Sequence, residues 1–288
     1  MGIRDWFKPR SSAAAPTPAQ PPGEVRFHLD RARMFDLGNT AQLEMLFRTD
    51  RAQRGPEWVE SFFDAAWCGS VVLADPQIII GPDNFPYLRL DLPRADTAFD
   101  SQCLAHLAAG CIDNRVGAAF FASPDDSPEN AQYVLSLGLI DSLLRFDSPY
   151  GDPVDVAESR VPADGDAFSV EPRAGGQTLV VEKAHEIMVG TPSAYYLPPH
   201  LACSLYLHLT EQWGMEDPTV ALVVDTKMRP HRSLVIGRKR SEFPSEAPVD
   251  AMAQNLIWHL DPGRMVMLMP EEWSHGEMTP LRTLFEGR

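Results

Sequence analysis

Apolar residues recur at helical spacing in two segments near the start of the chain. Thr40 is placed to cap a helix over residues 41–47, whose leucines and phenylalanine form one apolar stripe. Pro56 fits the first turn of a second helix over residues 56–67, because proline lacks the N–H that this position would leave unpaired. The pattern predicts two amphipathic helices ahead of the first strands.

The next apolar segments are short, β-branched and interrupted by turns, which is typical of strands. Residues 70–74 and 77–80 predict two strands separated by an Asp-Pro turn. Residues 87–92 alternate, so we expect their leucines to point inward and Arg89 and Asp91 to point outward. A helix that ends at a glycine, a buried strand and a strand–helix pair complete this part of the chain, over residues 101–110, 115–122 and 132–146.

Residues 147–176 differ in composition from the segments on either side. They contain four prolines, four glycines and seven acidic residues. A structureless loop of this length is uncommon inside one compact domain. We therefore predict an extended acidic linker here, between a first domain at residues 24–146 and a second at residues 177–288. Residues 1–23 are predicted to be a disordered tip followed by a Pro/Ala-rich tether.

The second domain has the most regular pattern in the sequence. Its apolar runs predict the order β-β-α-β-β-α-β-α, which favours helices on one face of a largely antiparallel sheet. An added edge strand from the linker, over residues 154–161 or 167–172, stays open. The predicted fold class is α+β, with two small domains that each pack a mostly antiparallel or mixed sheet with helices. The predicted segments of the second domain are residues 178–183, 186–190, 198–214, 219–226, 232–239, 249–261, 264–270 and 279–285.

Several of these segments carry a family resemblance. In the second half they are the helix–hairpin unit at residues 198–239, the Pro-Val-Asp opening of the helix at Pro248, and the near-terminal TPLRTLF. In the first half they are NFPYLRLDLP, RVGAAFFASP and QYVLSLGLIDSLLRF. With them the chain resembles the SseB (enhanced serine sensitivity B) family of bacterial proteins, in both its N-terminal-like and its C-terminal-like domain.

The resemblance implies a two-domain bacterial cytoplasmic protein with no established catalytic motif to transfer. The family name links it to serine tolerance, which is a physiological trait and not a mechanism. Three features depart from the family pattern: the Pro-rich tether, the acidic linker, and the absence of a tryptophan near the start of QYVLSLG.

Charge and hydropathy narrow the function classes. A net charge of −15 makes the chain repel phosphate backbones at long range, which argues against general nucleic-acid binding. No stretch approaches the roughly 20 apolar residues of a spanning helix, and the first ten residues lack the apolar core of a secretory signal. The four cysteines are too sparse for a secreted disulfide scaffold. We expect a protein of the bacterial cytoplasm, without a transmembrane segment.

Candidate catalytic and metal-binding residues are few. The sequence contains no glycine-rich phosphate loop, nucleophile elbow or His-Glu-x-x-His motif. Cys103, His106 and Cys111 form a metal-like cluster, but structural zinc sites show two close ligand pairs, so core packing is the favoured interpretation. Cys203 follows His200 by three residues, yet it continues an apolar helix stripe. We assign no catalytic residue, no metal site and no cofactor.

Six cations gather around the predicted hairpin of the second domain, which we call the basic hairpin. Arg232, Arg238 and Arg240 are separated by even numbers of residues, which predicts one shared strand face. One interpretation is edge protection, because charged residues keep a sheet edge from pairing with other chains. The other is docking of a protein with an acidic surface, or of the chain's own linker. The six are Lys227, Arg229, Arg232, Arg238, Lys239 and Arg240.

The first ten residues form a second candidate docking element. Trp6 and Phe7 stand among basic residues, directly ahead of the Pro/Ala-rich tether. Aromatic rings with nearby cations suit an anionic lipid surface or an acidic protein groove. We expect weak, salt-sensitive contact through these two rings, against the alternative of a frayed terminus without a role.

These observations favour a non-enzymatic regulatory or adaptor protein that acts through protein–protein contacts. The alternative is a small-molecule-binding or cysteine-dependent enzyme with a site between the two domains. A cysteine thiol within hydrogen-bond reach of a histidine in an open cleft would favour the enzyme, and thiols in dry cores would favour the adaptor.

Overall fold

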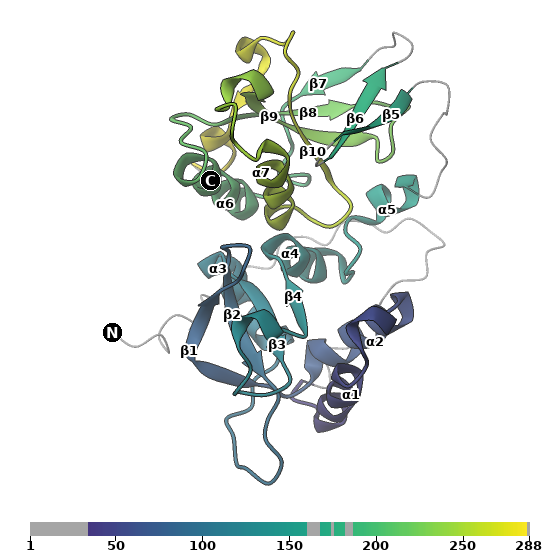
Figure 1. Ribbon diagram of the computed structural model, residues 1–288, viewed down its shortest axis with the longest axis vertical. Coiled ribbons are helices and arrows are strands. Elements are labelled where there is room, and N and C mark those ends of the chain that lie inside the picture. The colour runs from purple at the N-terminus through teal and green to yellow at the C-terminus, as the bar shows by residue number, and fades with distance from the viewer. Residues whose placement is uncertain (1–33, 160–167, 174–175, 182–186, 287–288) are drawn as a thin grey trace. The chain divides into compact units, whose positions relative to one another are not determined.

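Each half of the chain folds into a sheet combined with helices, which confirms the predicted α+β class. The computed structural model describes residues 34–159, 168–173, 176–181 and 187–286 (Figure 1). The chain divides into two compact units between Pro149 and Tyr150. None of the helices in the described ranges has the length and apolar character needed to cross a membrane.

The first unit combines a four-stranded sheet with four α-helices. Its strands lie in the order β1-β2-β3-β4; β2 and β3 run parallel, and the other neighbours run antiparallel. Apolar side chains from the helices and from one face of the sheet form its core. The elements are α1 (Leu37–Phe47), α2 (Pro56–Cys68), β1 (Val72–Ile80), β2 (Pro86–Asp91), α3 (Leu104–Asn114), β3 (Gly117–Phe121), β4 (Tyr133–Leu135) and α4 (Leu137–Phe146).

Helix α1 begins upstream of the residue that the sequence pattern indicates. Its N-cap is Asp36, whose carboxylate accepts from two backbone N–H groups of the first turn at 2.7 and 3.3 Å. Thr40 lies inside the helix, and its buried hydroxyl donates to the carbonyls of Asp36 and Ser70. The predicted Thr40 cap is therefore wrong, because a stronger acceptor one turn earlier satisfies the free N–H groups.

Helix α3 runs through Gly110, where the sequence predicted a stop. It ends at Arg115, which adopts the left-handed conformation with φ 55° and closes the last turn through its backbone N–H. Glycine weakens a helix interior by about 1 kcal/mol, and the burial of Leu107, Ala108 and Cys111 outweighs that cost.

Strand β1 is continuous across the predicted Asp-Pro turn. Its pairing with β2 stops after Leu73 and resumes at Ile78, so residues 74–77 oppose Arg89 alone. The two strands expected over residues 70–74 and 77–80 are therefore one strand interrupted by a wide bulge. Strand β2 holds them together because it pairs with both runs.

The polar side chains of β2 are buried, although the alternation predicted that they face outward. Arg89 is 9% exposed and Asp91 is 2% exposed. They lie opposite the leucines of β2, which pack into the core. The guanidinium of Arg89 lies over the ring of Phe121 and donates to the carbonyls of Ser123 and Pro124. Alternation assigned the correct face, but it could not show that the chain covers that face as well.

The second unit contains a mixed five-stranded sheet. Strands β10-β9-β8-β11 lie in this order, and β7 pairs with a further part of β8. Strand β10 is parallel to β9, and the other pairs are antiparallel, including the predicted β8–β9 hairpin. Strands β5 and β6 form a separate two-stranded sheet. The elements are α5 (Pro153–Ser159), β5 (Phe168–Arg173), β6 (Gly176–Val181), β7 (Met188–Gly190), α6 (Pro199–Glu211), β8 (Thr219–Val224), β9 (Arg232–Lys239), α7 (Val249–Asn255), β10 (Met265–Met269) and β11 (Thr279–Pro280).

Two predicted helices of this unit are shorter than expected. Helix α7 ends at Asn255 and continues as a 3₁₀ turn over Leu256–His259. The expected C-terminal helix is the short strand β11 followed by a 3₁₀ turn over Leu281–Leu284. Backbone pairing of Thr279 with Val220 draws this segment into the sheet.

The first part of the predicted linker is folded. Gly151 has φ 99°, and a Cβ there would lie 2.0 Å from the carbonyl oxygen of Pro262, so only glycine allows this close approach. The next residues begin α5, where Asp152 and Asp155 are buried. Residues 150–159 therefore belong to the second unit. Of the two strands left open by the sequence, the one over residues 167–172 forms as β5, but it pairs with β6 in a separate sheet and does not extend the edge of the five-stranded sheet.

We expect the second unit to require α5. A chain of residues 160–288 lacks Asp152 and Asp155, so Arg232 loses both carboxylates and Arg264 keeps only Asp261 among its ion-pair partners in the described residues. This should cost about 3–5 kcal/mol of unfolding free energy relative to residues 150–288. Urea unfolding followed by circular dichroism compares the two fragments. Equal midpoints would show that α5 is a dispensable appendage.

Candidate functional site

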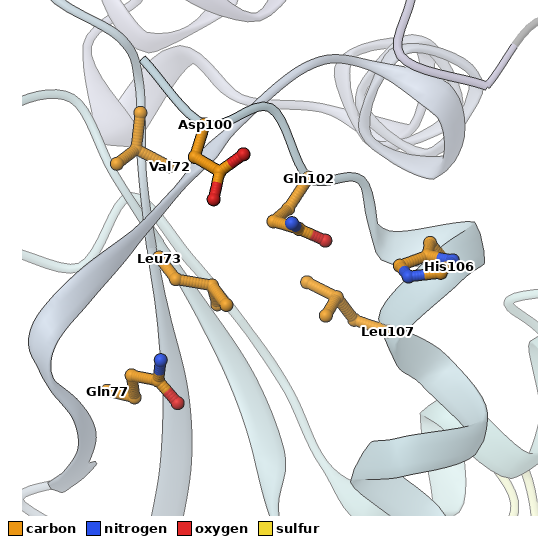
Figure 2. Close-up of a pocket in the computed structure, with 7 residues that line it drawn as sticks. All are labelled: Val72, Leu73, Gln77, Asp100, Gln102, His106 and Leu107. Atoms are coloured by element: carbon orange, nitrogen blue, oxygen red, sulfur yellow. The ribbon is translucent and has the colours of Figure 1, made fainter. Parts of the chain in front are cut away.

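The bulge of β1 opens one cavity on each side of the strand. One cavity has a volume of about 240 Å³ and lies between β1 and α3. Figure 2 shows Leu73 and Gln77 on β1 facing Leu107 and His106 across the cavity, while the carboxylate of Asp100 points into it from above, near Val72. The Oε1 atom of Gln77 is buried and has no hydrogen-bond partner among the described residues. The remaining lining residues are Val72, Gln102, His106 and Leu107.

The second cavity, of about 260 Å³, lies over the buried ion pair of β2. Arg89 Nε donates to Asp91 Oδ1 at 2.9 Å. Burial raises the pKa of the Asp91 carboxyl, and the hydrogen bond and charge of Arg89 oppose that rise. Both side chains line the cavity, together with Val72, Leu73, Ala74, Asp75, Pro76, Ile79 and Pro124.

This arrangement suits the binding of a small molecule. The second cavity joins an aliphatic wall to a fixed pair of opposite charges, which are the features of a small-molecule site. Its described lining residues include no cysteine, serine or histidine, so the groups there that could take part in chemistry are the carboxylates of Asp75 and Asp91. We call it the Arg–Asp cavity.

The cysteines do not form a reactive site with the histidines singled out by the sequence. Cys103 and Cys111 are buried, as is Cys68, and Cys203 is half-buried. Burial raises the pKa of the Cys111 thiol to about 12, which keeps it protonated. His106 is exposed and lies 5.9 Å from the ring of Phe35. Within the described residues, no three potential His, Cys, Asp or Glu ligands gather around a common point.

The structure contains a buried serine–histidine pair that the sequence pattern does not predict. Ser204 Oγ lies 2.9 Å from His259 Nδ1, and the two side chains come from α6 and from the 3₁₀ turn after α7. Burial and the neighbouring His208 lower the pKa of His259 well below its usual value. Both residues are almost fully buried, so a substrate cannot reach them. The hydrogen bond between them therefore serves to join α6 to the 3₁₀ turn after α7.

Most cations of the basic hairpin have acceptors within the chain. Arg232 donates to Asp155 Oδ1 from Nε at 2.9 Å and from Nη2 at 2.6 Å, and its Nη2 lies 3.3 Å from Asp152 Oδ2. Arg240 pairs with Asp250. Strand β9 lies between β8 and β10, so edge protection is not its role.

The other members of the basic hairpin lie apart from Arg232. Arg238 stacks on Phe243 and donates to the carbonyl of Trp213. Lys239 donates to the carbonyl of Glu271 at 2.6 Å, and Arg229 bonds to His231 and to carbonyls of its own turn. Only Lys227 has no acceptor for its ammonium group among the described residues. The six cations therefore do not form one free basic surface.

The partners of Arg232 were missed because their segment was assigned to a linker. Asp152, Asp155 and Glu158 are spaced by three residues, which places them on one side of a helix. Asp155 and Asp152 contact Arg232, while Glu158 lies 3.2 Å from His231 Nδ1. This spacing was the available signal, but high acidity with proline and glycine obscured it.

Strand β7 presents an apolar edge. Met188, Val189 and Gly190 pair with β8, and within the described residues β8 is the only strand paired with β7. Ile187 is 41% exposed, Met188 61% and Val189 43%. Alternate residues of an edge strand normally pack inward, so three consecutive exposed apolar side chains form an unusual surface.

The docking tip at Trp6 and Phe7 lies outside the described residues. No family model, curated protein or solved structure matches the chain.

We expect Arg232→Met to destabilise the protein by about 3–5 kcal/mol, because it leaves two buried carboxylates without their main cation. Arg240→Met is the matched control: its ion pair with Asp250 is exposed and should contribute less than about 1 kcal/mol. Urea unfolding measures both. Equal losses would show that burial of the Arg232 pair has no special energetic role.

We also expect stability to fall as pH drops below about 6.5, the pKa of histidine in an unfolded chain. Because the pKa of His259 is lowered in the folded protein, this imidazole becomes protonated in the unfolded chain at a pH where it is still neutral in the folded chain. The slope should reach about 1.4 kcal/mol per pH unit and disappear above neutrality. Urea unfolding between pH 5 and 8 should show a shallower slope in His259→Gln than in the exposed control His275→Gln, and identical slopes would contradict this.

Proposed function

We propose that this protein is a non-enzymatic regulatory or adaptor protein that binds another protein through the edge of β7. The observation that carries the proposal is the run of exposed apolar residues at Ile187, Met188 and Val189. An exposed sheet edge can accept an added strand, whose backbone supplies hydrogen bonds and whose side chains meet the apolar ones.

The chemistry of β7 indicates the kind of partner. The segment from Ile187 to Gly190 contains no charged residue and no proline to block strand addition. A second copy of the chain is disfavoured, because two molecules with a net charge of −15 repel each other and a three-residue strand offers little pairing. We infer an extended, apolar segment of a different protein that is not strongly acidic.

Docking of an acidic protein on the basic hairpin has less support than docking on β7, because five of the six cations already donate to groups of the same chain. The cysteine-dependent alternative finds little support in buried thiols, at least three of which are closed to solvent.

On the family resemblance we also propose that the protein is a bacterial, cytoplasmic relative of the SseB family, with a role in serine tolerance. The order of α6, the β8–β9 hairpin, α7 and β10 is consistent with that resemblance. A disruption strain tested for growth on excess serine, with and without the restored gene, checks the physiological part. Unchanged growth would contradict it.

The docking proposal is tested with the double substitution Ile187→Lys/Met188→Lys. Charges on the edge should prevent strand addition, so a protein captured from the source cell and then purified should bind about tenfold more weakly or worse. Met45→Lys is the matched control, because Met45 is 70% exposed on α1 and lies in the other unit. Binding that survives the double substitution would refute the β7 site, and a native dimer lost on substitution would identify a second copy as the occupant.

A further inference from the structure

The Arg–Asp cavity contains polar groups that the fold itself leaves unused. Arg89 uses Nε for Asp91 and Nη2 for the carbonyls of Ser123 and Pro124, at 3.3 and 3.0 Å. In the described part of the chain, no acceptor lies within hydrogen-bond distance of its third nitrogen, Nη1. A guanidinium carries five N–H donors, so two of them remain available at a side chain that is 11% exposed.

The carboxylate beside it is in a similar position. Asp91 Oδ1 accepts from Arg89, and no group of the described residues donates to Oδ2. Asp91 is 2% exposed as a whole residue, and it contributes to the lining of the cavity. The cavity lining therefore offers one donor group and one acceptor group of opposite charge, on two side chains that are hydrogen-bonded to each other.

The surrounding charges discriminate against simple ions. Asp126 and Asp125 lie close enough to Asp91 to add to the rise in its pKa that burial causes, and Asp75 lines the cavity. These carboxylates repel an anion that carries no positive group. A cation without a negative group would be attracted, but it would leave the N–H groups of Arg89 unmatched and face a like charge.

We propose that the Arg–Asp cavity binds a small zwitterion of the α-amino-acid class. Its carboxylate accepts from Arg89 Nη1, and its ammonium group donates to Asp91 Oδ2. Both groups of the ligand are then paired with opposite charges, which is the condition for burying them. This site lies in the first unit and does not depend on the protein contact proposed for β7.

The dimensions and walls restrict the ligand further. A volume of about 260 Å³ is below the range of about 300–1,000 Å³ that is typical of drug-sized ligands, so the ligand is small. The walls are aliphatic, which favours a short apolar side chain. They are formed by Val72, Leu73, Ala74, Pro76, Ile79 and Pro124.

The test uses L-valine and two analogues on the full chain, by isothermal titration calorimetry. 3-Methylbutanoate lacks the ammonium group of valine, and 2-methylpropylamine lacks its carboxylate. We expect valine to bind saturably and each analogue to bind about tenfold more weakly or worse, because each leaves one charged group of the lining unmatched. Equal affinity of either analogue, or no saturable binding of valine at millimolar concentration, would overturn the proposal.

Two variants locate the site. Ala74→Phe fills the cavity without removing the ion pair and should abolish valine binding. Gln77→Ala is the matched control: it alters the same bulge but lines the neighbouring cavity, so it should keep the affinity. If Ala74→Phe does not fold, Asp91→Asn replaces it and should also lose binding. Valine binding that survives in the folded blocking variant would place the ligand elsewhere and refute the assignment.

Discussion

Pairing of buried guanidinium groups with carboxylates constrains both units of this protein. A buried charge without a partner costs several kcal/mol, so the chain must bring a carboxylate to each buried arginine. In the first unit Asp91 meets Arg89 within the same strand. In the second unit Arg232 pairs with Asp155 of α5, and Arg264 pairs with Asp155 and Asp261.

This constraint explains local features that would otherwise look unrelated. The contact of Gly151 with the carbonyl of Pro262 brings the start of α5 close to the turn that holds Asp261 and Arg264. Tyr196 packs its ring against the Arg264 guanidinium at 4.3 Å, so an aromatic face covers the ion pair. Burial and pairing together turn a short acidic helix into a structural part of the second unit.

The two proposed binding surfaces depend on irregular strand pairing. In β1 the bulge leaves residues 74–77 opposite Arg89 alone, and a cavity of about 260 Å³ lined by Arg89 and Asp91 lies beside it. Among the described residues, the short strand β7 pairs with β8 alone, and the side chains of Met188 and Val189 are exposed.

Local sequence determined much of the element order, because apolar periodicity and turn residues act over a few neighbouring positions. The β8–β9 hairpin, the helix opened by Pro56 and the inward leucines of β2 all follow from such patterns. The cap at Asp36, the continuation of α3 and the single bulged strand β1 depended on tertiary context.

The candidate sites were less predictable than the elements. Alternation correctly placed Arg89 and Asp91 on one face of β2, whereas the six basic residues around the β8–β9 hairpin do not form one free surface. Whether those side chains are buried, paired or available was decided by segments distant in sequence, such as α5 for Arg232 and the Pro124 loop for Arg89. A short stretch of sequence specifies the chemistry of a side chain, but its partners and its exposure are set by whichever segments the folded chain packs against it.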